Sequence, residues 1–240
     1  MSIKRLHPDL YRYDEKHLDP LLLTGDPAKI LTEECLQVYT LRVFTPEFCA
    51  KLIEETEHHG AWENELAIDM HPPRLDEGED FQAIPLKEKK YLSKENIKEL
   101  HAANDEDDQL LNCASFFKMP GLNEPFQQVI MKHINPLANH IWKTFNIQMI
   151  RSPYVLKYDP DEPASAEGQR PHWDQAPLQL VVYLNEGFEG GGTHYPRWNK
   201  TVGRGAKPGT AALFPGSLSH EHGGLPVTRG DRYVLICIFF

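Results

Sequence analysis

Residues 171–184, PHWDQAPLQLVVYL, combine a His-x-Asp pair with a strand of alternating character. In extended backbone, residues i and i+2 point to the same side, so the side chains of His172 and Asp174 can reach one ion. One face of the following strand is wholly apolar, as expected of a strand covered by helices: Leu178, Leu180, Val182 and Leu184. The other face carries Gln179, Val181 and Tyr183. This stretch therefore predicts a buried strand with a metal-binding pair at its start.

Two later residues complete a recognisable ligand set. His222, in HEHGGLP, supplies a second imidazole, and Arg232 follows it by ten residues in RGDRY. Two histidines and one carboxylate on one face of an octahedron suit Fe(II) and leave three positions open for substrate and O2. Arg232 adds a planar cation that fits a distal carboxylate. Together they outline a 2-oxoglutarate-dependent oxygenase with His172, Asp174, His222 and Arg232 as its catalytic residues.

The pair by itself is a weak signal, because a chain with 12 His and 35 acidic residues contains such pairs by chance. The alternative interpretation is a surface histidine beside a loop aspartate, with Arg232 paired to an ordinary surface acid. The spacing also leaves two candidates for the second imidazole, since His220 and His222 lie two residues apart.

Several segments resemble the C-terminal catalytic domain of the procollagen lysyl hydroxylases. They are YDPDEP (158–163), PHWD (171–174), LNEGFEGGGTHY (184–195), FPGSLSHEHGGLP (214–226) and RGDRYVLICIF (229–239), with a weaker match at FTPEFCAKLIEETEHHGAW (44–62). The resemblance implies iron ligands at His172, Asp174 and His222. It also implies 2-oxoglutarate contacts at Arg232 and Tyr158, and a structural place for His220.

The chain departs from this family at two points. Val181 stands where the family has an asparagine that contacts 2-oxoglutarate, and Gln179 or Tyr183 on the same face could replace the missing hydrogen bond. The loop between Tyr158 and the His-x-Asp pair is also longer here. We therefore place Gln179 and Tyr183 with Arg232 and Tyr158 as cosubstrate-binding candidates.

The pattern of elements predicts an α+β, mainly β fold in one domain over 1–240. An N-terminal arm (1–36) is followed by a strand at 37–44, a helix capped by Thr45 and Gly60, and a helical region at 123–145 that Pro136 must interrupt. The core at 150–240 is expected to hold strands at 152–158, 178–184, 192–198, 209–215 and 232–240. Helices before antiparallel strands indicate helices that back one sheet, and the family implies a double-stranded β-helix, or jelly roll.

Residues 70–110 form an insertion relative to the family, with acidic clusters on both sides of a lysine-rich centre. Two interpretations stay open: a solvated loop, or a lid whose carboxylates attract a cationic substrate.

Composition limits the partners. A net charge of −10 argues against nucleic acid. No apolar run reaches the roughly eighteen residues of a membrane span. The first residues lack the apolar region of a secretory signal, so a cytoplasmic protein is expected. Homo-oligomers are left open.

The expected enzyme is an Fe(II)- and 2-oxoglutarate-dependent dioxygenase that consumes O2, with ascorbate as a candidate reductant. The favoured reaction hydroxylates a protein side chain of the lysyl type. The alternatives are a hydroxylase of a free amino acid or small metabolite, and a catalytically silent binding module of the same fold.

Overall fold

The structure is a computed structural model, and it describes residues 4–60, 62–66, 110–119, 121–143, 145–162, 168–174, 176–217 and 219–240. The predicted insertion at 70–110 lies almost wholly outside the described residues, and so does the choice between lid and loop. Within the described part of the chain, no helix is both long and apolar enough to cross a membrane.

Antiparallel strands dominate the fold, as predicted. The larger sheet has the order β1-β2-β11-β7-β14-β5-β4-β3, and a four-stranded sheet has the order β10-β9-β12-β6. The strands of the larger sheet are β1 (Thr32–Cys35), β2 (Val38–Arg42), β3 (Glu63–Leu66), β4 (Leu110–Ser115), β5 (Tyr154–Tyr158), β7 (Leu178–Tyr183), β11 (Thr210–Pro215) and β14 (Arg232–Phe239). Those of the smaller sheet are β6 (Gln169–His172), β9 (Thr193–Tyr195), β10 (Lys200–Val202) and β12 (His222–Gly224). A two-stranded ribbon pairs β8 (Glu189–Gly190) with β13 (Val227–Arg229).

All five strands predicted in the core are present, with one correction. The segment expected as a strand at 192–198 ends at Tyr195, and Pro196–Trp198 form a 3-10 turn, η6. Pro196 has no backbone N–H to donate to a neighbouring strand, which stops the ladder there. Of the smaller sheet, only β9 was predicted; β6, β10 and β12 were not, because three or four residues give too little alternation to recognise.

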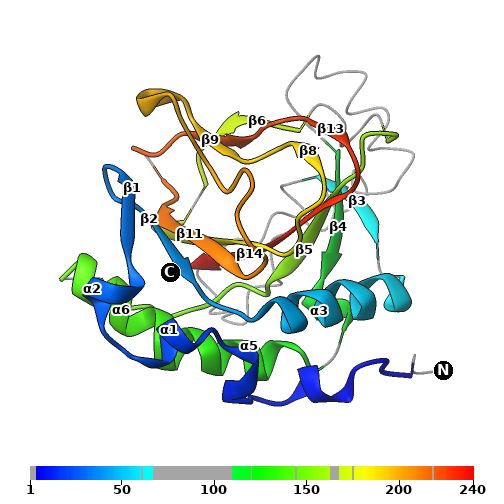
Figure 1. The fold of residues 1–240 in the computed structure, drawn as a ribbon, viewed down its shortest axis with the longest axis horizontal. Coiled ribbons are helices and arrows are strands. Elements are labelled where there is room, and N and C mark those ends of the chain that lie inside the picture. The colour runs from blue at the N-terminus through cyan, green and yellow to red at the C-terminus, as the bar shows by residue number, and fades with distance from the viewer. Residues whose placement is uncertain are drawn as a thin grey trace, which may run out of the picture.

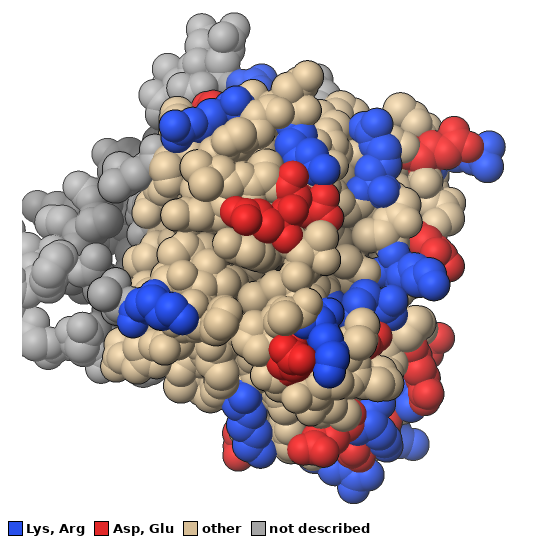
Figure 2. Space-filling model, turned by 60° about the vertical axis from the view of Figure 1, so that its left-hand side comes forward, with Lys and Arg blue, Asp and Glu red and all other residues tan. Residues whose placement is uncertain are grey.

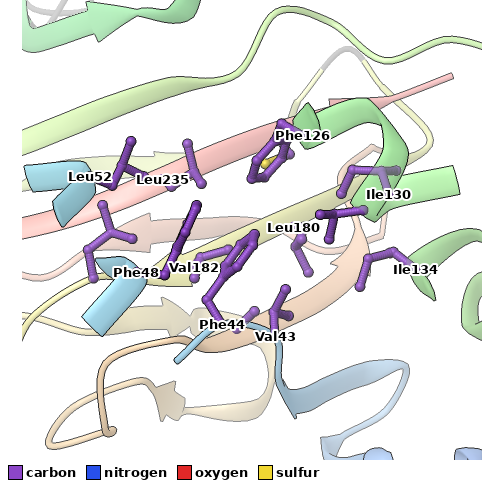
Figure 3. Close-up of a cluster of buried hydrophobic side chains, with 14 of the residues drawn as sticks. Val43, Phe44, Phe48, Leu52, Phe126, Ile130, Ile134, Leu180, Val182 and Leu235 are labelled. Atoms are coloured by element: carbon purple, nitrogen blue, oxygen red, sulfur yellow. The ribbon is translucent and has the colours of Figure 1, made fainter. Parts of the chain in front are cut away.

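Helices cover the outer face of the larger sheet, as Figure 1 shows. They are α3 (Pro46–His59), α5 (Asn123–Val129), the π-helical turn η5 (Ile130–Ile134) and α6 (Asn135–Ile141). Beneath them lies the apolar face of β7 predicted from the sequence, whose leucines and valine are at most 2% exposed. Figure 3 shows Leu180 and Val182 from β7 among side chains from α3, α5 and β14. Burial of each such side chain contributes on the order of 1.5–3 kcal/mol to folding.

The ends of α3 follow the predicted signals. The Thr45 hydroxyl accepts a hydrogen bond from the Phe48 backbone N–H at 3.2 Å, and Gly60 closes the helix at φ 61°. The second helical region is interrupted as predicted. The π turn η5 ends at Ile134, two residues before Pro136. Pro136 lacks the N–H that a regular α-helix needs. Asn123 does not cap this helix: it is the first helical residue, and its side chain accepts a hydrogen bond from Ser152 instead.

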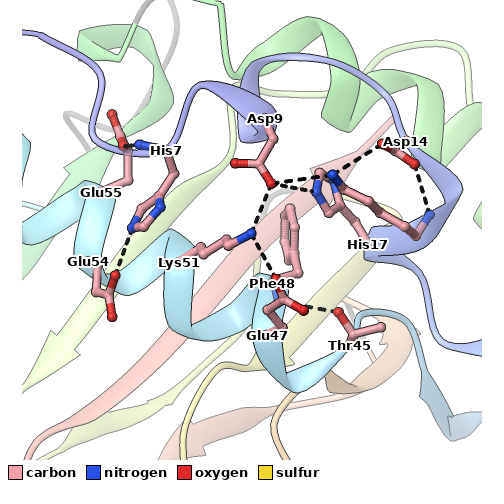
Figure 4. Close-up of polar contacts among 11 residues, drawn as sticks. His7, Asp9, Asp14, His17, Thr45, Glu47, Phe48, Lys51, Glu54 and Glu55 are labelled. Atoms are coloured by element: carbon pink, nitrogen blue, oxygen red, sulfur yellow. Dashed lines mark hydrogen bonds and ion pairs between the residues drawn. The ribbon is translucent and has the colours of Figure 1, made fainter.

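The N-terminal arm is held to α3 by polar contacts. Up to Ile30 it consists of short helical turns: η1 (Pro8–Tyr11), η2 (Glu15–His17), α1 (Pro20–Leu23) and α2 (Pro27–Ile30). The last residues of the arm form β1, an edge strand of the larger sheet. Glu55, which is fully buried, accepts hydrogen bonds from the His7 backbone N–H at 2.6 Å and from the Tyr11 hydroxyl at 2.8 Å. Lys51 bridges Asp9 of the arm and Glu47 of its own helix (Figure 4). The arm therefore packs as part of the fold.

On the face drawn in Figure 2, the described acidic and basic side chains lie interspersed around an uncharged centre. The described acidic side chains therefore do not form one patch on this face.

Candidate metal centre

The inner face of the larger sheet turns toward the smaller sheet, and a second cluster of buried side chains lies on it. From β7 this cluster takes Val181 and Tyr183, from β5 it takes Tyr158, and from β14 it takes Val234, Ile236 and Ile238. Arg232 begins β14 on this same face, by the alternation of the strand. The predicted division of β7 into an apolar face under the helices and a second face with Val181 and Tyr183 is therefore confirmed.

The structure brings His172, Asp174 and His222 together. Their candidate ligand atoms all lie within 4.8 Å of one another, the only such group of three or more among the described residues. His172 and His222 are paired directly across strands β6 and β12. Asp174 is fixed beside them because its backbone N–H donates to the Gly216 carbonyl at 2.8 Å.

Hydrogen bonds set the tautomer of each ligand histidine. Nδ1 of His222 lies 3.0 Å from the His220 carbonyl, and Nδ1 of His172 lies 2.9 Å from the Arg170 carbonyl. A carbonyl only accepts, so each Nδ1 carries the hydrogen and each Nε2 presents a lone pair. These lone pairs face the Asp174 carboxylate, at 3.7 Å from His172 and 3.5 Å from His222. This is how protein partners orient metal-binding imidazoles.

His220 is excluded as a ligand by its own contacts. Its Nε2 lies 2.8 Å from the Leu36 carbonyl, and its Nδ1 lies 2.8 Å from the Ser219 hydroxyl. Nε2 therefore donates and Nδ1 accepts, so both ring nitrogens are committed. The geometry therefore favours His222 over His220 as the second candidate imidazole.

Burial shifts the pKa of each group in the triad toward its uncharged form. It raises the pKa of Asp174 to about 7, an effect that the charge of Arg151 partly offsets. Burial first, and then the nearby His172, lower the pKa of His222 to about 3, and burial also lowers the pKa of His172. Asp174 Oδ2 is buried and finds no hydrogen-bond partner among the described residues. Two neutral imidazoles and a carboxylate that lacks a partner fit a divalent cation of the Fe(II) type.

The Arg232 guanidinium is 2% exposed, and its Nε and Nη1 atoms find no partner among the described residues. It lies over the Tyr158 ring, 4.7 Å from the ring centroid, on the strand paired with Arg232. A buried guanidinium in this state needs an anion, and a carboxylate matches its geometry. The residues present therefore fit the distal carboxylate of 2-oxoglutarate as well as the metal.

Two glycines lie in close contact with the side chains of Tyr158 and Arg232. A Cβ at Gly224 would lie 3.1 Å from the Tyr158 hydroxyl, so Tyr158 reaches β12 two residues from His222. A Cβ at Gly191 would lie 2.8 Å from Arg232 Cδ. The three glycines at 190–192 all have positive φ, a backbone conformation that favours glycine.

The two remaining cosubstrate-binding candidates, Gln179 and Tyr183, differ in whether their polar atoms already have a hydrogen-bond partner. Gln179 is 4% exposed on the inner face, and its Oε1 has no partner among the described residues. Tyr183 is buried there too, but its hydroxyl already donates to Thr193 at 3.2 Å. Two other arginines that could hold a carboxylate are engaged elsewhere: Arg229 pairs with Glu189 at the surface, and Arg204 donates to the Gly191 carbonyl.

One inner-face residue received no role from the sequence. Tyr195, on β9, is fully buried, and its ring lies 6.2 Å from the His222 ring. Alternation along 193–195 places it on the same side as Thr193, so the pattern contained the signal. Tyr195 was missed because the strand expected at 192–198 was not assigned to the site.

Comparison with known proteins confirms the resemblance expected from the sequence. The chain is 28% identical over 96% of its length to rat multifunctional procollagen lysine hydroxylase and glycosyltransferase LH3, and 27% identical over 96% to rat procollagen-lysine,2-oxoglutarate 5-dioxygenase 1. It is thus related to 2-oxoglutarate-dependent dioxygenases. The chain spans only 28% of the length of each of these relatives. Residues 1–77 also match an OGFOD2-like domain.

Two solved structures show the more distant range of similarity. A prolyl 4-hydroxylase of Phytophthora capsici covers 100% of this chain at 13% identity, with 66% of its own chain matched and a TM-score of 0.49. The viral collagen prolyl hydroxylase of Paramecium bursaria Chlorella virus-1, in its 2OG complex, covers 60% of this chain and 83% of its own at 22% identity, with a TM-score of 0.44.

Proposed function

We propose that this protein is an Fe(II)- and 2-oxoglutarate-dependent hydroxylase of a protein side chain, with a lysyl side chain as the favoured substrate. The observation that carries the proposal is the presence of two unsatisfied sites between the two sheets. One is the His172–Asp174–His222 cluster, and the other is the buried Arg232 guanidinium. A ligand that chelates a metal at one end and carries a carboxylate at the other satisfies both.

The chain's own residues have defined tasks in this reaction. His172, Asp174 and His222 would hold Fe(II), and Arg232 with Tyr158 would hold and orient the 5-carboxylate of 2-oxoglutarate. The bound metal supplies the redox chemistry by which O2, 2-oxoglutarate and a C–H bond give succinate, CO2 and an alcohol. The apolar side chains around Arg232, such as Val234 and Ile236, exclude water and so strengthen its hold on a carboxylate.

Two observations support a peptide substrate over a free metabolite. The relatives named above act, by their names, on procollagen lysine. Trp173, which lies between two of the ligands in sequence, is 54% exposed. An accessible indole beside the metal residues offers an aromatic surface to a cationic side chain such as lysine.

Release of succinate tests the proposal. The protein is incubated with Fe(II), 2-oxoglutarate and ascorbate in three ways: alone, with lysine-containing peptides, and with free amino acids including L-lysine. Stimulation by peptides alone, with a hydroxylated lysyl residue in the mass spectrum, is expected. Stimulation by free amino acids alone would replace the peptide substrate by a small one. No iron-dependent succinate in any arm would leave a silent binding module.

The Asp174→Ala variant links the activity to the metal residues. It should bind Fe(II) weakly and release no succinate, whereas Asp161→Ala, which removes an exposed carboxylate, should behave as the parent. Succinate release by Asp174→Ala at the parent rate would contradict the ligand assignment.

We also infer that the eight- and four-stranded sheets form the two halves of a jelly roll. Antiparallel pairing throughout, with β7 between β11 and β14 and β12 between β9 and β6, supports this topology. The single-domain organisation and the cytoplasmic location stay predictions from the sequence.

A further inference from the structure

Buried polar atoms without partners are concentrated at the proposed site. Nine such side-chain atoms occur among the described residues, and five of them belong to four inner-face or metal-site residues: Asp174, Gln179, Tyr195 and Arg232. Buried polar groups are normally hydrogen-bonded, so each exception calls for a reason. The triad explains Asp174 and the carboxylate contact explains Arg232, but Tyr195 has no role in the proposed reaction so far.

The position of Tyr195 is tightly fixed. Its ring packs edge-on against Phe214 with ring centroids 5.1 Å apart, and Phe214 in turn lies 4.8 Å from the His222 ring. Phe214 sits in β11, two residues beyond Ala212, whose partner on β7 is Val181. The Tyr195 side chain therefore comes from the smaller sheet toward a region that the larger sheet lines with the small side chains Ala212 and Val181, all in one cluster.

The Tyr195 hydroxyl can act as a donor in this region. Burial raises its pKa well above the ordinary value for tyrosine, and the neighbouring Tyr183, Cys35 and Asp174 add to the effect, so the hydroxyl keeps its proton at neutral pH. Tyr183 is a poor alternative donor, because its hydroxyl already donates to Thr193. The atom of Gln179 that has no partner among the described residues is Oε1, which can only accept a hydrogen bond.

We propose that the Tyr195 hydroxyl donates a hydrogen bond to an oxygen of 2-oxoglutarate bound between the triad and Arg232. The inference rests on the proposed function and adds a residue to it. Without ligand, an unpaired buried hydroxyl lowers the stability of the fold, whereas a bound oxo-acid would satisfy it. The Tyr195 hydroxyl, which comes from the smaller sheet, also adds a polar group to the cluster that contains Val181 of β7, whose side chain is apolar.

The test compares Tyr195→Phe with the parent in the absence of turnover. Binding of 2-oxoglutarate is measured by calorimetry on protein saturated with Mn²⁺, and the melting temperature is measured without metal or 2-oxoglutarate. Loss of one donor should raise the Kd for 2-oxoglutarate about 5- to 30-fold. The melting temperature of the ligand-free variant should equal or exceed that of the parent, because a phenyl ring leaves no unsatisfied oxygen.

Tyr233→Phe is the matched control. Tyr233 is also buried, but it lies on the outer face and its hydroxyl donates to Glu57 at 2.6 Å. Its removal should lower the melting temperature and leave the Kd for 2-oxoglutarate unchanged.

The outcomes separate the two proposals. An unchanged Kd in Tyr195→Phe, with 2-oxoglutarate binding by the parent intact, would overturn the Tyr195 contact alone. A lower melting temperature of the ligand-free variant together with an unchanged Kd would show that the hydroxyl serves the fold through a buried water, and would overturn it as well. Absence of metal-dependent 2-oxoglutarate binding by the parent would overturn the proposed function and the Tyr195 contact with it.

Discussion

Nε2 of His222 lies 3.5 Å from Oδ2 of Asp174, with both side chains almost fully enclosed. Burial keeps the imidazole neutral, since the pKa of His222 falls to about 3, and it holds the proton on the carboxyl, since the pKa of Asp174 rises to about 7. A cation at this point replaces that proton. A proton and a metal ion therefore compete for the Asp174 carboxylate.

The first prediction is that metal affinity depends on pH through Asp174. Because the pKa of this carboxyl is raised to about 7, metal binding should release close to one proton per ion below that pH and none well above it. The apparent affinity for Mn²⁺ should rise about tenfold per pH unit up to about 7 and then level off. Calorimetry in buffers of different ionisation enthalpy measures the proton release. A flat affinity between about pH 5.5 and 7 would contradict the raised pKa.

The second prediction concerns the carboxylate contact. Arg232→Ala should raise the Km for 2-oxoglutarate about 30- to 150-fold, equivalent to roughly 2–3 kcal/mol, and leave Mn²⁺ affinity nearly unchanged. The reason is that the guanidinium is buried and two of its nitrogens, Nε and Nη1, have no hydrogen-bond partner among the described residues. Arg229→Ala is the control, because Arg229 is exposed and pairs with Glu189. Equal Km values for Arg232→Ala and the parent would require another cation to hold the cosubstrate.

The third prediction tests the close contact between Gly203 and Tyr183. Gly203 has φ 83°, and a Cβ there would overlap the Tyr183 ring. Gly203→Ala should lower the free energy of unfolding by roughly 2–5 kcal/mol. Gly205→Ala is a matched control, since Gly205 also has positive φ, at 68°, but has no atom near the added methyl group. It should lose only about 1 kcal/mol, from backbone strain alone. Similar losses in urea denaturation of the two variants would argue against the packing of Tyr183 described here.

The fourth prediction concerns acid unfolding of the N-terminal arm. Burial alone would raise the pKa of Asp9, but hydrogen bonds from Lys51 and His17 hold it well below its usual range. A depressed folded pKa stabilises the protein above the unfolded value near 4, and this contribution is lost as the pH falls below it. Asp9→Asn should therefore lower stability at neutral pH and lose less on acidification. Parallel stability curves for the variant and the parent between about pH 5 and 2 would contradict this role.

The sequence by itself determined the strand 178–184 and its two faces, because a strict alternation leaves only one side to bury under helices. It also determined the caps of α3 and the break before Pro136, and it placed His172 and Asp174 on one side of an extended segment, since these features depend on neighbours within a few residues. The positions of the five core strands followed from similar local patterns of strand-forming residues bounded by glycine and proline.

Only the tertiary structure showed the contact that occupies His220, because that contact involves the Leu36 carbonyl, which is far away in sequence. It likewise showed that the Tyr183 hydroxyl donates to Thr193, whereas the Tyr195 hydroxyl and Gln179 Oε1 find no hydrogen-bond partner in the described part of the chain. Whether a polar atom is satisfied depends on chain segments that meet only after the two sheets pack. No pattern within one strand carries that information.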